Sequence, residues 1–240
     1  MVTTLLLSLI VQVSNGQGTL SIKQDVVAAQ PVVGSKVLLT EFQITSGSSA
    51  AAITAAVIEL ETIVAKMKNK SGAEKKALEN QMRSVVSAIL DLQHLGQRAM
   101  VTHWENLGKT AKLKKMRDNY MKLFRQLIEE NYMEQARKYI GGNYQIIFTS
   151  QDEKGTKPMV KGRIKKTDVD VLVEFDVVKQ GSAWKVQDIR LDTTSLEATY
   201  RSSFNRLIKR KGGLDAGFPE LLKSMEKRLA ELRSGSSKSL

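Results

Sequence analysis

The sequence predicts an α+β fold, because the spacing of its apolar residues changes from helical to strand-like and back again. From residue 51 to 140 the apolar residues recur every three or four positions, as on one face of a helix. From 144 to 191 they alternate with polar residues, as along a half-buried strand, and from 196 to 232 the helical spacing returns. Helices, four strands joined by turns, and further helices describe an antiparallel sheet covered by the N- and C-terminal helices, which fill its concave face or leave a cavity there.

Composition restricts the function more than it identifies one. The chain has 240 residues, 42% of them apolar, which is enough for a sizeable core. It has no cysteine, which excludes disulfides, thiolate metal sites and cysteine nucleophiles, and two histidines, which makes a His-rich metal centre improbable. The formal charge of +12 permits an anionic partner such as nucleic acid or a membrane surface.

The first residues predict a secretory signal at 1–16. Residues 1–13 are largely apolar and uncharged, too short to span a bilayer, and Ser14-Asn15-Gly16 offers a cleavage site. No basic residue precedes the apolar run, so a buried first strand is the alternative. We expect a poorly structured segment at 17–50, a single domain at 51–232 and a frayed tail at 233–240.

Capping residues and glycines delimit the predicted helices. Ser71 and Glu74 have the spacing of a capping box before a second helix, and Asp91 can cap a third. The longest helix is predicted from Thr110 to Ile140, before Gly141-Gly142. Towards the C-terminus, Thr194 and Glu197 repeat the capping-box spacing, and a last helix is predicted to enter near Pro219.

The strands are predicted at 144–148, 159–166, 169–177 and 184–191. Turns at 152–155, 167–168 and 180–182 connect them. In the last strand the apolar positions change from even numbers (Trp184, Val186) to odd ones (Ile189, Leu191). This change predicts a β-bulge near Asp188.

A series of short motifs between Val85 and Leu232 resembles a known family. The motifs, in order, are Ile89-Leu90-Asp91, Ala99-Met100, His103-Trp104, Phe124, Leu127, Tyr132, Tyr139, Trp184-Lys185-Val186, Asp188-Ile189, Ser195-Leu196, Tyr200-Arg201, Phe204 and Gly213-Leu214. Their order and spacing resemble the MlaC/Ttg2D (toluene-tolerance) family of periplasmic phospholipid-binding proteins. The chain departs from the family pattern at Thr193-Thr194, where a glycine usually precedes the serine, and at Gln187, where tyrosine is frequent.

The resemblance implies an NTF2-like fold and a carrier rather than an enzyme. Such a carrier holds phospholipid acyl chains in an apolar pocket and moves the lipid across the periplasm between the inner and outer membranes. The implied partners are an inner-membrane ABC transporter with a ring-forming lipid-binding subunit and an outer-membrane lipoprotein complex, with transient membrane contact. No cofactor is implied beyond the phospholipid cargo, and no metal or nucleic acid.

Apolar residues of the strands and of the later helices are the candidate lipid-binding residues. They are Ile146, Phe148, Val171, Val173, Phe175, Trp184 and Val186 on one wall, and Leu123, Phe124, Leu127, Tyr200, Phe204 and Leu207 on the other. Arg201 is the first candidate for the headgroup phosphate. The same apolar residues would form the core of any α+β domain, so their role as a lining depends on the resemblance.

Two other functions compete with the carrier. An NTF2-like enzyme, an isomerase or hydrolase, would need a carboxylate with a shifted pKa in the cavity, and Asp188 is the candidate; an aspartate bonded to backbone N–H groups at a bulge is the preferred interpretation. A nucleic-acid-binding module would use the basic clusters Lys161, Arg163, Lys165-Lys166 and Lys209-Arg210-Lys211. No aromatic residue interleaves with these clusters as a base-stacking surface requires.

Overall fold

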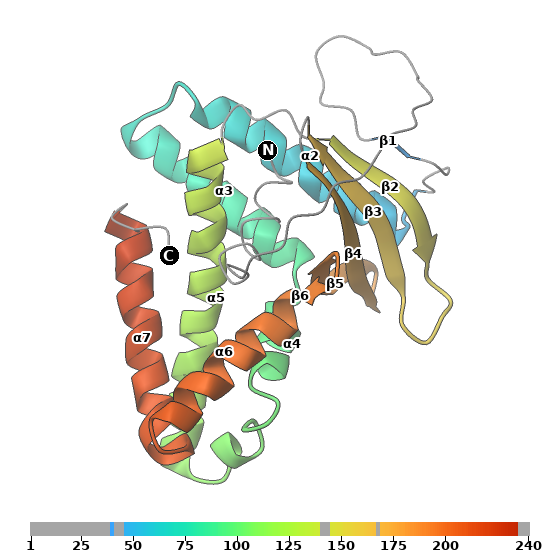
Figure 1. Cartoon of the computed structure of the whole chain (residues 1–240). Helices are drawn as coiled ribbons and strands as arrows, with labels where there is room; N and C mark the ends of the chain where they lie inside the picture. Colours follow the sequence, from blue (N-terminus) through green and yellow to red (C-terminus); the bar gives the residue numbers. More distant parts are fainter. Residues whose placement is uncertain (1–38, 41–45, 140–144, 167–168, 235–240) are drawn as a thin grey trace.

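The computed structural model of the protein describes residues 39–40, 46–139, 145–166 and 169–234. The predicted signal at 1–16 and most of the segment 17–50 lie outside the described residues, as do Gly141-Gly142, the turn at 167–168 and the tail from 235. The described residues form a layer of helices beside an antiparallel sheet (Figure 1), so the predicted α+β class is confirmed.

The helices fall close to the predicted segments. They are α2 (Ser49–Met67), α3 (Gly72–Ile89), α4 (Leu92–Ala99), the short 3-10 helix η1 (Asn106–Gly108), α5 (Ala111–Tyr139), α6 (Leu196–Arg210) and α7 (Leu214–Ser234). α7 begins five residues before Pro219, the predicted entry point, and contains this proline.

Polar side chains start these helices, although not always the predicted ones. The predicted cap of α4 is confirmed, since Asp91 Oδ1 accepts a hydrogen bond of 3.0 Å from His94 N–H. Ser71 is the N-cap residue of α3 but its side chain makes no capping bond. α6 is capped by Ser195, whose Oγ accepts from Ala198 N–H at 3.0 Å, one residue later than the Thr194 expected from the spacing.

The sheet contains the four predicted strands and two short additions. The long strands are β2 (Gln145–Asp152), β3 (Met159–Lys166), β4 (Val169–Gln180) and β5 (Ala183–Leu191), paired antiparallel in chain order. A two-residue strand extends each edge: β1 (Leu39–Thr40), parallel to β2, and β6 (Thr194–Ser195), antiparallel to β5. The predicted number of four is therefore correct for the long strands and too low for the sheet.

The predicted bulge in β5 is confirmed and determines which residues face the helices. Asp188 pairs with Asp176 and Val186 pairs with Val177, so Gln187 is the extra residue between them. Because of this extra residue, both Val186 and Ile189 face the helical layer. Asp188 lies on the opposite face of the sheet, with Asp176.

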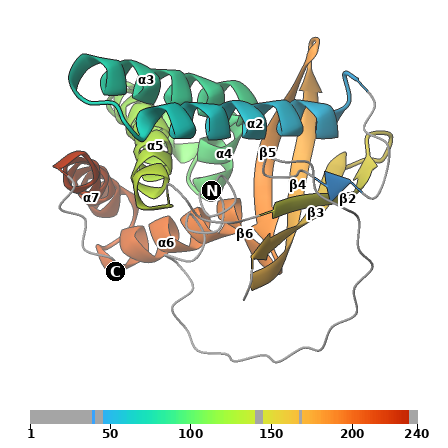
Figure 2. The same ribbon diagram turned by 90° about the horizontal axis from the view of Figure 1, so that it is seen from above.

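The inner face of the sheet and one face of the helical layer form a continuous apolar core. A row of paired residues, Phe148, Gly162, Val173 and Leu191, crosses the inner face from β2 to β5. Phe148 and Val173 are fully buried. α2 and α3 lie side by side against the same side of the sheet (Figure 2), and they supply the residues opposite it.

Two helical glycines provide a matched test of helix packing. A Cβ on Gly217 of α7 would lie 2.5 Å from the Ile208 carbonyl oxygen and 2.6 Å from its Cα, so α6 and α7 must separate to accept it. A Cβ on Gly96 of α4 would meet the end of the flexible Met121 side chain at 2.7 Å. We expect Gly217→Ala to lower the free energy of unfolding by about 2–3 kcal/mol. In Gly96→Ala the gain in helix propensity of about 1 kcal/mol offsets the free-energy cost of moving the Met121 side chain, so stability should change little. Urea unfolding of both variants measures the difference, and equal stabilities would contradict the close helix approach.

Candidate functional site

An apolar cavity lies between helices α2 and α3 and the inner face of strands β4 and β5. Its volume is about 30 Å³. The lining residues are Ile53, Ala56, Val57 and Leu60 from α2, Val86, Ile89 and Leu90 from the end of α3, and Phe175, Val186 and Ile189 from the sheet. All of them are apolar, so no polar side chain in the lining requires a hydrogen-bond partner.

The spacing of residues in each element explains why they meet here. Ile53, Val57 and Leu60 recur at intervals of three and four and therefore share one face of α2. Phe175 pairs with Ile189 across β4 and β5, so both point to the same side of the sheet. The bulge at Gln187 adds Val186 to this side.

The cavity is too small for a hydrocarbon chain in this conformation. Pockets that hold a small organic ligand usually measure about 300–1,000 Å³, whereas a volume of about 30 Å³ is the share of one water molecule in the liquid. A hydrocarbon chain can enter the cavity only if one of its walls moves. The attachment of each wall therefore decides how the site can open.

The end of α3 is firmly attached to the rest of the molecule. Asp91 N–H donates a 2.8 Å hydrogen bond to the Val186 carbonyl of β5, and the Lys185 ammonium bonds the Ala88 carbonyl. On its other side, α3 is joined to α5 through Ser87, whose hydroxyl donates to Glu129 at 2.6 Å. Arg83 of α3 pairs with the buried Glu130 of α5 at 3.1 Å.

α2 is bonded to the sheet at its N-terminal end. The carboxylate of Glu153, in the turn after β2, accepts hydrogen bonds from the Ser49 backbone N–H and from the Ser49 hydroxyl, the latter at 2.7 Å. Nearby, the Trp184 indole N–H donates to the Gly47 carbonyl at 3.0 Å. The negative charge of Glu153 at the start of a helix is also favourable to the helix dipole. We call the Glu153–Ser49 contact the α2 latch.

The structure places the sheet residues of the predicted site together, and two of them in the cavity. Phe175 and Val186 line the cavity. Ile146, Phe148 and Val173 are buried on the same inner face of the sheet, and Val171 is half-buried there. Their binding of lipid stays a prediction.

The predicted helix residues lie in another part of the same hydrophobic core. Phe124 of α5 contacts Tyr200 and Phe204 of α6, with ring centroids 5.2 and 6.2 Å apart. Tyr120 and Phe218 extend this cluster. Leu123, Leu127 and Leu207 pack against the same core. These side chains join helices to one another and do not line the cavity between α2, α3 and the sheet.

Trp184 and Arg201 have other contacts. Trp184 is buried beneath the start of α2 and is bonded to Gly47 as described above. Arg201 pairs with Glu197 one turn earlier in α6, at 2.7 Å, and Glu197 also pairs with Arg98 of α4 at 3.2 Å. Arg201 therefore helps to join α6 to α4, and it is not among the residues that line the cavity.

The sequence analysis missed the α2 and α3 side of the cavity. The helical spacing of Ile53, Val57 and Leu60 was visible as an amphipathic face. An apolar face shows that a helix packs against something, and it does not show which layer it meets. The contact between α2 and β5 joins residues more than one hundred positions apart, which no local pattern could indicate.

Asp188 has a structural role. Its carboxylate accepts hydrogen bonds from the Ser195 hydroxyl at 2.6 Å and from the Glu197 backbone N–H at 2.9 Å, so it holds the start of α6. Burial raises the pKa of the Asp188 carboxyl, and the bonds from Ser195 and Glu197 partly oppose this rise. Both oxygens have partners, and the residue faces away from the cavity, as the bulge requires. The enzyme hypothesis loses its candidate residue.

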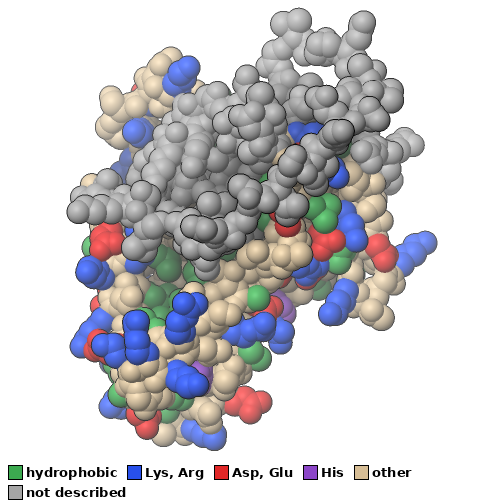
Figure 3. Space-filling model, viewed as in Figure 1, with side chains coloured by type: hydrophobic (Ala, Val, Ile, Leu, Met, Phe, Trp, Pro, Cys, Tyr) green, Lys and Arg blue, Asp and Glu red, His purple; other side chains and the backbone are tan. Residues whose placement is uncertain are grey.

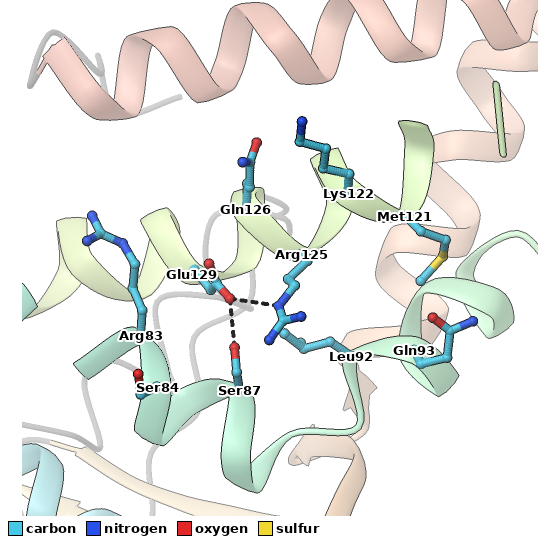
Figure 4. Close-up of a pocket in the computed structure, with 10 residues that line it drawn as sticks. All are labelled: Arg83, Ser84, Ser87, Leu92, Gln93, Met121, Lys122, Arg125, Gln126 and Glu129. Atoms are coloured by element: carbon cyan, nitrogen blue, oxygen red, sulfur yellow. Dashed lines mark hydrogen bonds and ion pairs between the residues drawn. The ribbon is translucent and has the colours of Figure 1, made fainter. Parts of the chain in front are cut away.

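A second, larger hollow lies on the outside of the helical layer, between α3, α4 and α5. It has a volume of about 630 Å³ and a mostly polar lining that includes Arg83, Lys122, Arg125 and Glu129. Figure 4 shows Glu129 between Arg125 and the Ser87 hydroxyl, with an Arg125 Nε to Glu129 distance of 3.0 Å. Most residues that line this open cleft are polar or charged, and two of its cations already bind carboxylates of α5.

The described residues contain neither a metal-binding cluster nor a membrane-spanning helix. Across residues 46–139, 145–166 and 169–234, His, Asp and Glu form no group of three that could hold a metal ion. In this part of the chain no helix has the length and apolar character needed to cross a bilayer.

Comparison with known proteins agrees with this architecture. The family model described as MlaC protein matches residues 55–227, and no curated protein matches the sequence. Among solved structures, the phospholipid-binding protein from Ralstonia solanacearum, in complex with a phospholipid, superposes with a TM-score of 0.58. It is 20% identical, and the match covers 76% of this chain and 97% of that one. At this identity the superposition shows a common fold, and the family match over most of the domain shows that the chain belongs to the MlaC family.

Proposed function

We propose that the protein is a phospholipid carrier that holds acyl chains in the cavity between α2, α3 and the sheet. The observation on which the proposal depends is the entirely apolar lining of that cavity. Membership of the MlaC family and the common fold with a phospholipid-binding protein support the same function. The fully bonded Asp188 gives no support to an enzyme.

The energetics of such a carrier follow from hydrocarbon transfer. Burial of acyl chains is worth about 0.8 kcal/mol per CH₂ group, so two chains gain roughly 20 kcal/mol or more relative to water. A membrane offers nearly the same gain, so exchange between membrane and carrier is close to balanced. The dry cavity removes the cost of exposing the chains to water during transit.

Loading requires an opening, and we infer that α2 is the wall that moves. The end of α3 is bonded both to β5 and to α5, whereas the hydrogen bonds from α2 to the sheet side are at its first two residues, in the α2 latch and from the Ala50 N–H to Gln151 at 3.4 Å. Release of Glu153 from Ser49 would let the N-terminal half of α2, with Ile53 and Val57, move away from Phe175. The apolar surfaces so exposed would close around the acyl chains.

The proposed carrier works in the periplasm, after export through the predicted signal at 1–16. It exchanges lipid between the inner and outer membranes, with an ABC transporter that has a ring-forming lipid-binding subunit on one side and a lipoprotein complex on the other. These partners and this location are those implied by the family resemblance. Mass spectrometry of an organic extract of protein purified under mild conditions would detect the bound phospholipid. A lipid-free protein that also does not bind added phospholipid would contradict the carrier function.

Adjacent alanines of α2 test the position of the site. Ala56 lines the cavity, whereas Ala55 is exposed on the outer face of the helix. We expect Ala56→Leu to fill the space that an acyl chain would enter and to reduce the bound phospholipid at least severalfold. Ala55→Leu should load normally. Lipid content per protein, measured by mass spectrometry, compares the two, and equal loading would place the acyl chains elsewhere.

The α2 latch makes a kinetic prediction. Glu153→Gln removes the charge from the latch and should weaken it by about 1–2 kcal/mol, making opening about tenfold more frequent. The rate of transfer of a fluorescent phospholipid between protein and vesicles should rise accordingly. Glu59→Gln removes the same charge from an exposed position of α2 and serves as the control. If both variants exchange lipid at the wild-type rate, opening does not begin at the latch.

Removal of the Asp188 carboxylate separates the structural from the catalytic role. Asp188→Ala leaves the Ser195 hydroxyl and the Glu197 N–H without their partner and should destabilise the protein by about 1–3 kcal/mol. Because Asp188 lies outside the cavity, the variant that remains folded should still load phospholipid. Thermal unfolding and lipid extraction measure the two effects, and a loss of loading at full stability would contradict the assignment.

A further inference from the structure

Basic residues gather at the end of the helical layer that is most distant from the sheet. We call this surface the basic tip; its residues are Lys109, Lys112, Lys114, Lys115, Lys209 and Arg210, all exposed. Figure 3 shows Lys and Arg side chains over this lower part of the molecule, where Figure 1 places the turn between α6 and α7.

The helix arrangement brings the two halves of the tip together. α5 and α7 run in the same direction, because Tyr120 contacts Phe218 near the start of both helices and Glu130 meets Arg233 further along. The first turn of α5 therefore lies beside the turn that connects α6 to α7. α6 is 15 residues long, so its basic end lies about 20 Å from its first residue at the edge of the sheet.

The charge of the basic tip is not neutralised, in contrast to the basic strand β3. On β3, Lys161 pairs with Glu174 at 3.1 Å and Arg163 pairs with Asp170 at 2.8 Å. Among the described residues, none of the six tip residues forms an ion pair. The exposed carboxylates Glu105, Asp118 and Asp215 lie near the same helix starts, and they leave an excess of positive charge.

The same end of the molecule presents apolar surface. Val101, in the connection between α4 and α5, is 42% exposed. Trp104 in the same connection is half-buried, and the Arg117 guanidinium of α5 lies 5.0 Å from the centre of its ring. A hydrogen bond of 3.4 Å from Asn205 to Thr102 holds this connection against α6. Tryptophan beside basic residues is typical of surfaces that contact the interface between lipid and water.

We propose that the basic tip is a docking surface for an anionic lipid bilayer. The proposal rests on the proposed carrier function in one respect, that a carrier must visit membranes. Docking at the tip leaves α2, at the opposite end of the molecule in Figure 1, turned away from the lipid surface. The protein is thus held at a membrane with its cavity accessible to a protein partner, and binding to the bilayer does not require the cavity to open.

Vesicle binding of a charge variant tests the docking surface. The wild-type protein should bind vesicles of phosphatidylcholine and phosphatidylglycerol in equal parts, and bind pure phosphatidylcholine vesicles far more weakly. Each basic residue near an anionic surface contributes enough that the triple change Lys112→Gln, Lys115→Gln, Arg210→Gln should weaken binding about 100-fold. Binding of the wild type should also fall steeply with added salt, since the Debye length shortens to about 3 Å at 1 M.

The control removes the same charge at another place. Lys66, Lys68 and Lys76 are exposed around the turn between α2 and α3, away from the tip. The triple variant with glutamine at these positions should bind the anionic vesicles within a few fold of the wild type. Equal losses in the two triple variants would mean that net charge alone attracts the protein, and this result would overturn the tip as a docking surface. If the wild-type protein does not bind anionic vesicles, as expected if the tip binds an acidic protein, the proposal is overturned too.

The two tryptophans of the chain report the orientation of the bound protein. Trp104 lies near the tip and Trp184 lies at the sheet, and the chain has no other tryptophan. In Trp184→Phe, brominated lipids in anionic vesicles should quench the fluorescence of the remaining Trp104. In Trp104→Phe they should leave the fluorescence of Trp184 unquenched. The opposite pattern would show docking through the sheet and overturn the proposal. Phospholipid loading of the tip variant, measured separately, shows whether the carrier function itself holds.

Discussion

The hydrogen bond from the Asp91 N–H to the Val186 carbonyl joins the helical layer to the sheet at the point where β5 is irregular. Asp91 follows Leu90, the C-cap residue of α3, and caps α4, so the bond to β5 lies between the two helices. Val186 precedes the bulge that turns both Val186 and Ile189 towards those helices. If β5 ran through Gln187 in regular alternation, without the bulge, the residues beyond it would turn to the opposite faces, and Asp188 would face the core.

The continuous hydrophobic core has an aromatic part and a largely aliphatic part. Between α5, α6 and α7 the aromatic rings of Tyr120, Phe124 and Phe204 contact one another closely, and burial raises the pKa of the Tyr120 hydroxyl well above its usual value. That hydroxyl is bonded to the Gly96 carbonyl, so the aromatic cluster has a fixed geometry. Between α2, α3 and the sheet the side chains are aliphatic apart from Phe175 and leave unfilled space. Ring contacts and this hydrogen bond join the helices α4 to α7, whereas the space between α2, α3 and the sheet is about 30 Å³.

Local patterns predicted the fold well and the site incompletely. The strand at 159–166 and the bulge near Asp188 follow from alternation, which depends on neighbouring residues, and both are confirmed. The family resemblance is confirmed by the match over 55–227. The assignment of Phe124 and Phe204 to a wall of the pocket depended on how α5 and α6 meet the other elements. That packing is decided by contacts across the chain, and the helical periodicity of these residues is the same whether they face a cavity or another helix.

The cavity lining is aliphatic apart from Phe175, and this has a consequence for lipid selectivity. A surface without hydrogen-bonding groups can distinguish guests by length and bulk, and it has no means of recognising the chemical identity of a head that remains in water. A carrier built in this way would take up lipids roughly in proportion to their abundance among those delivered to it. Any preference for one lipid species would then originate in the machinery that delivers and receives it.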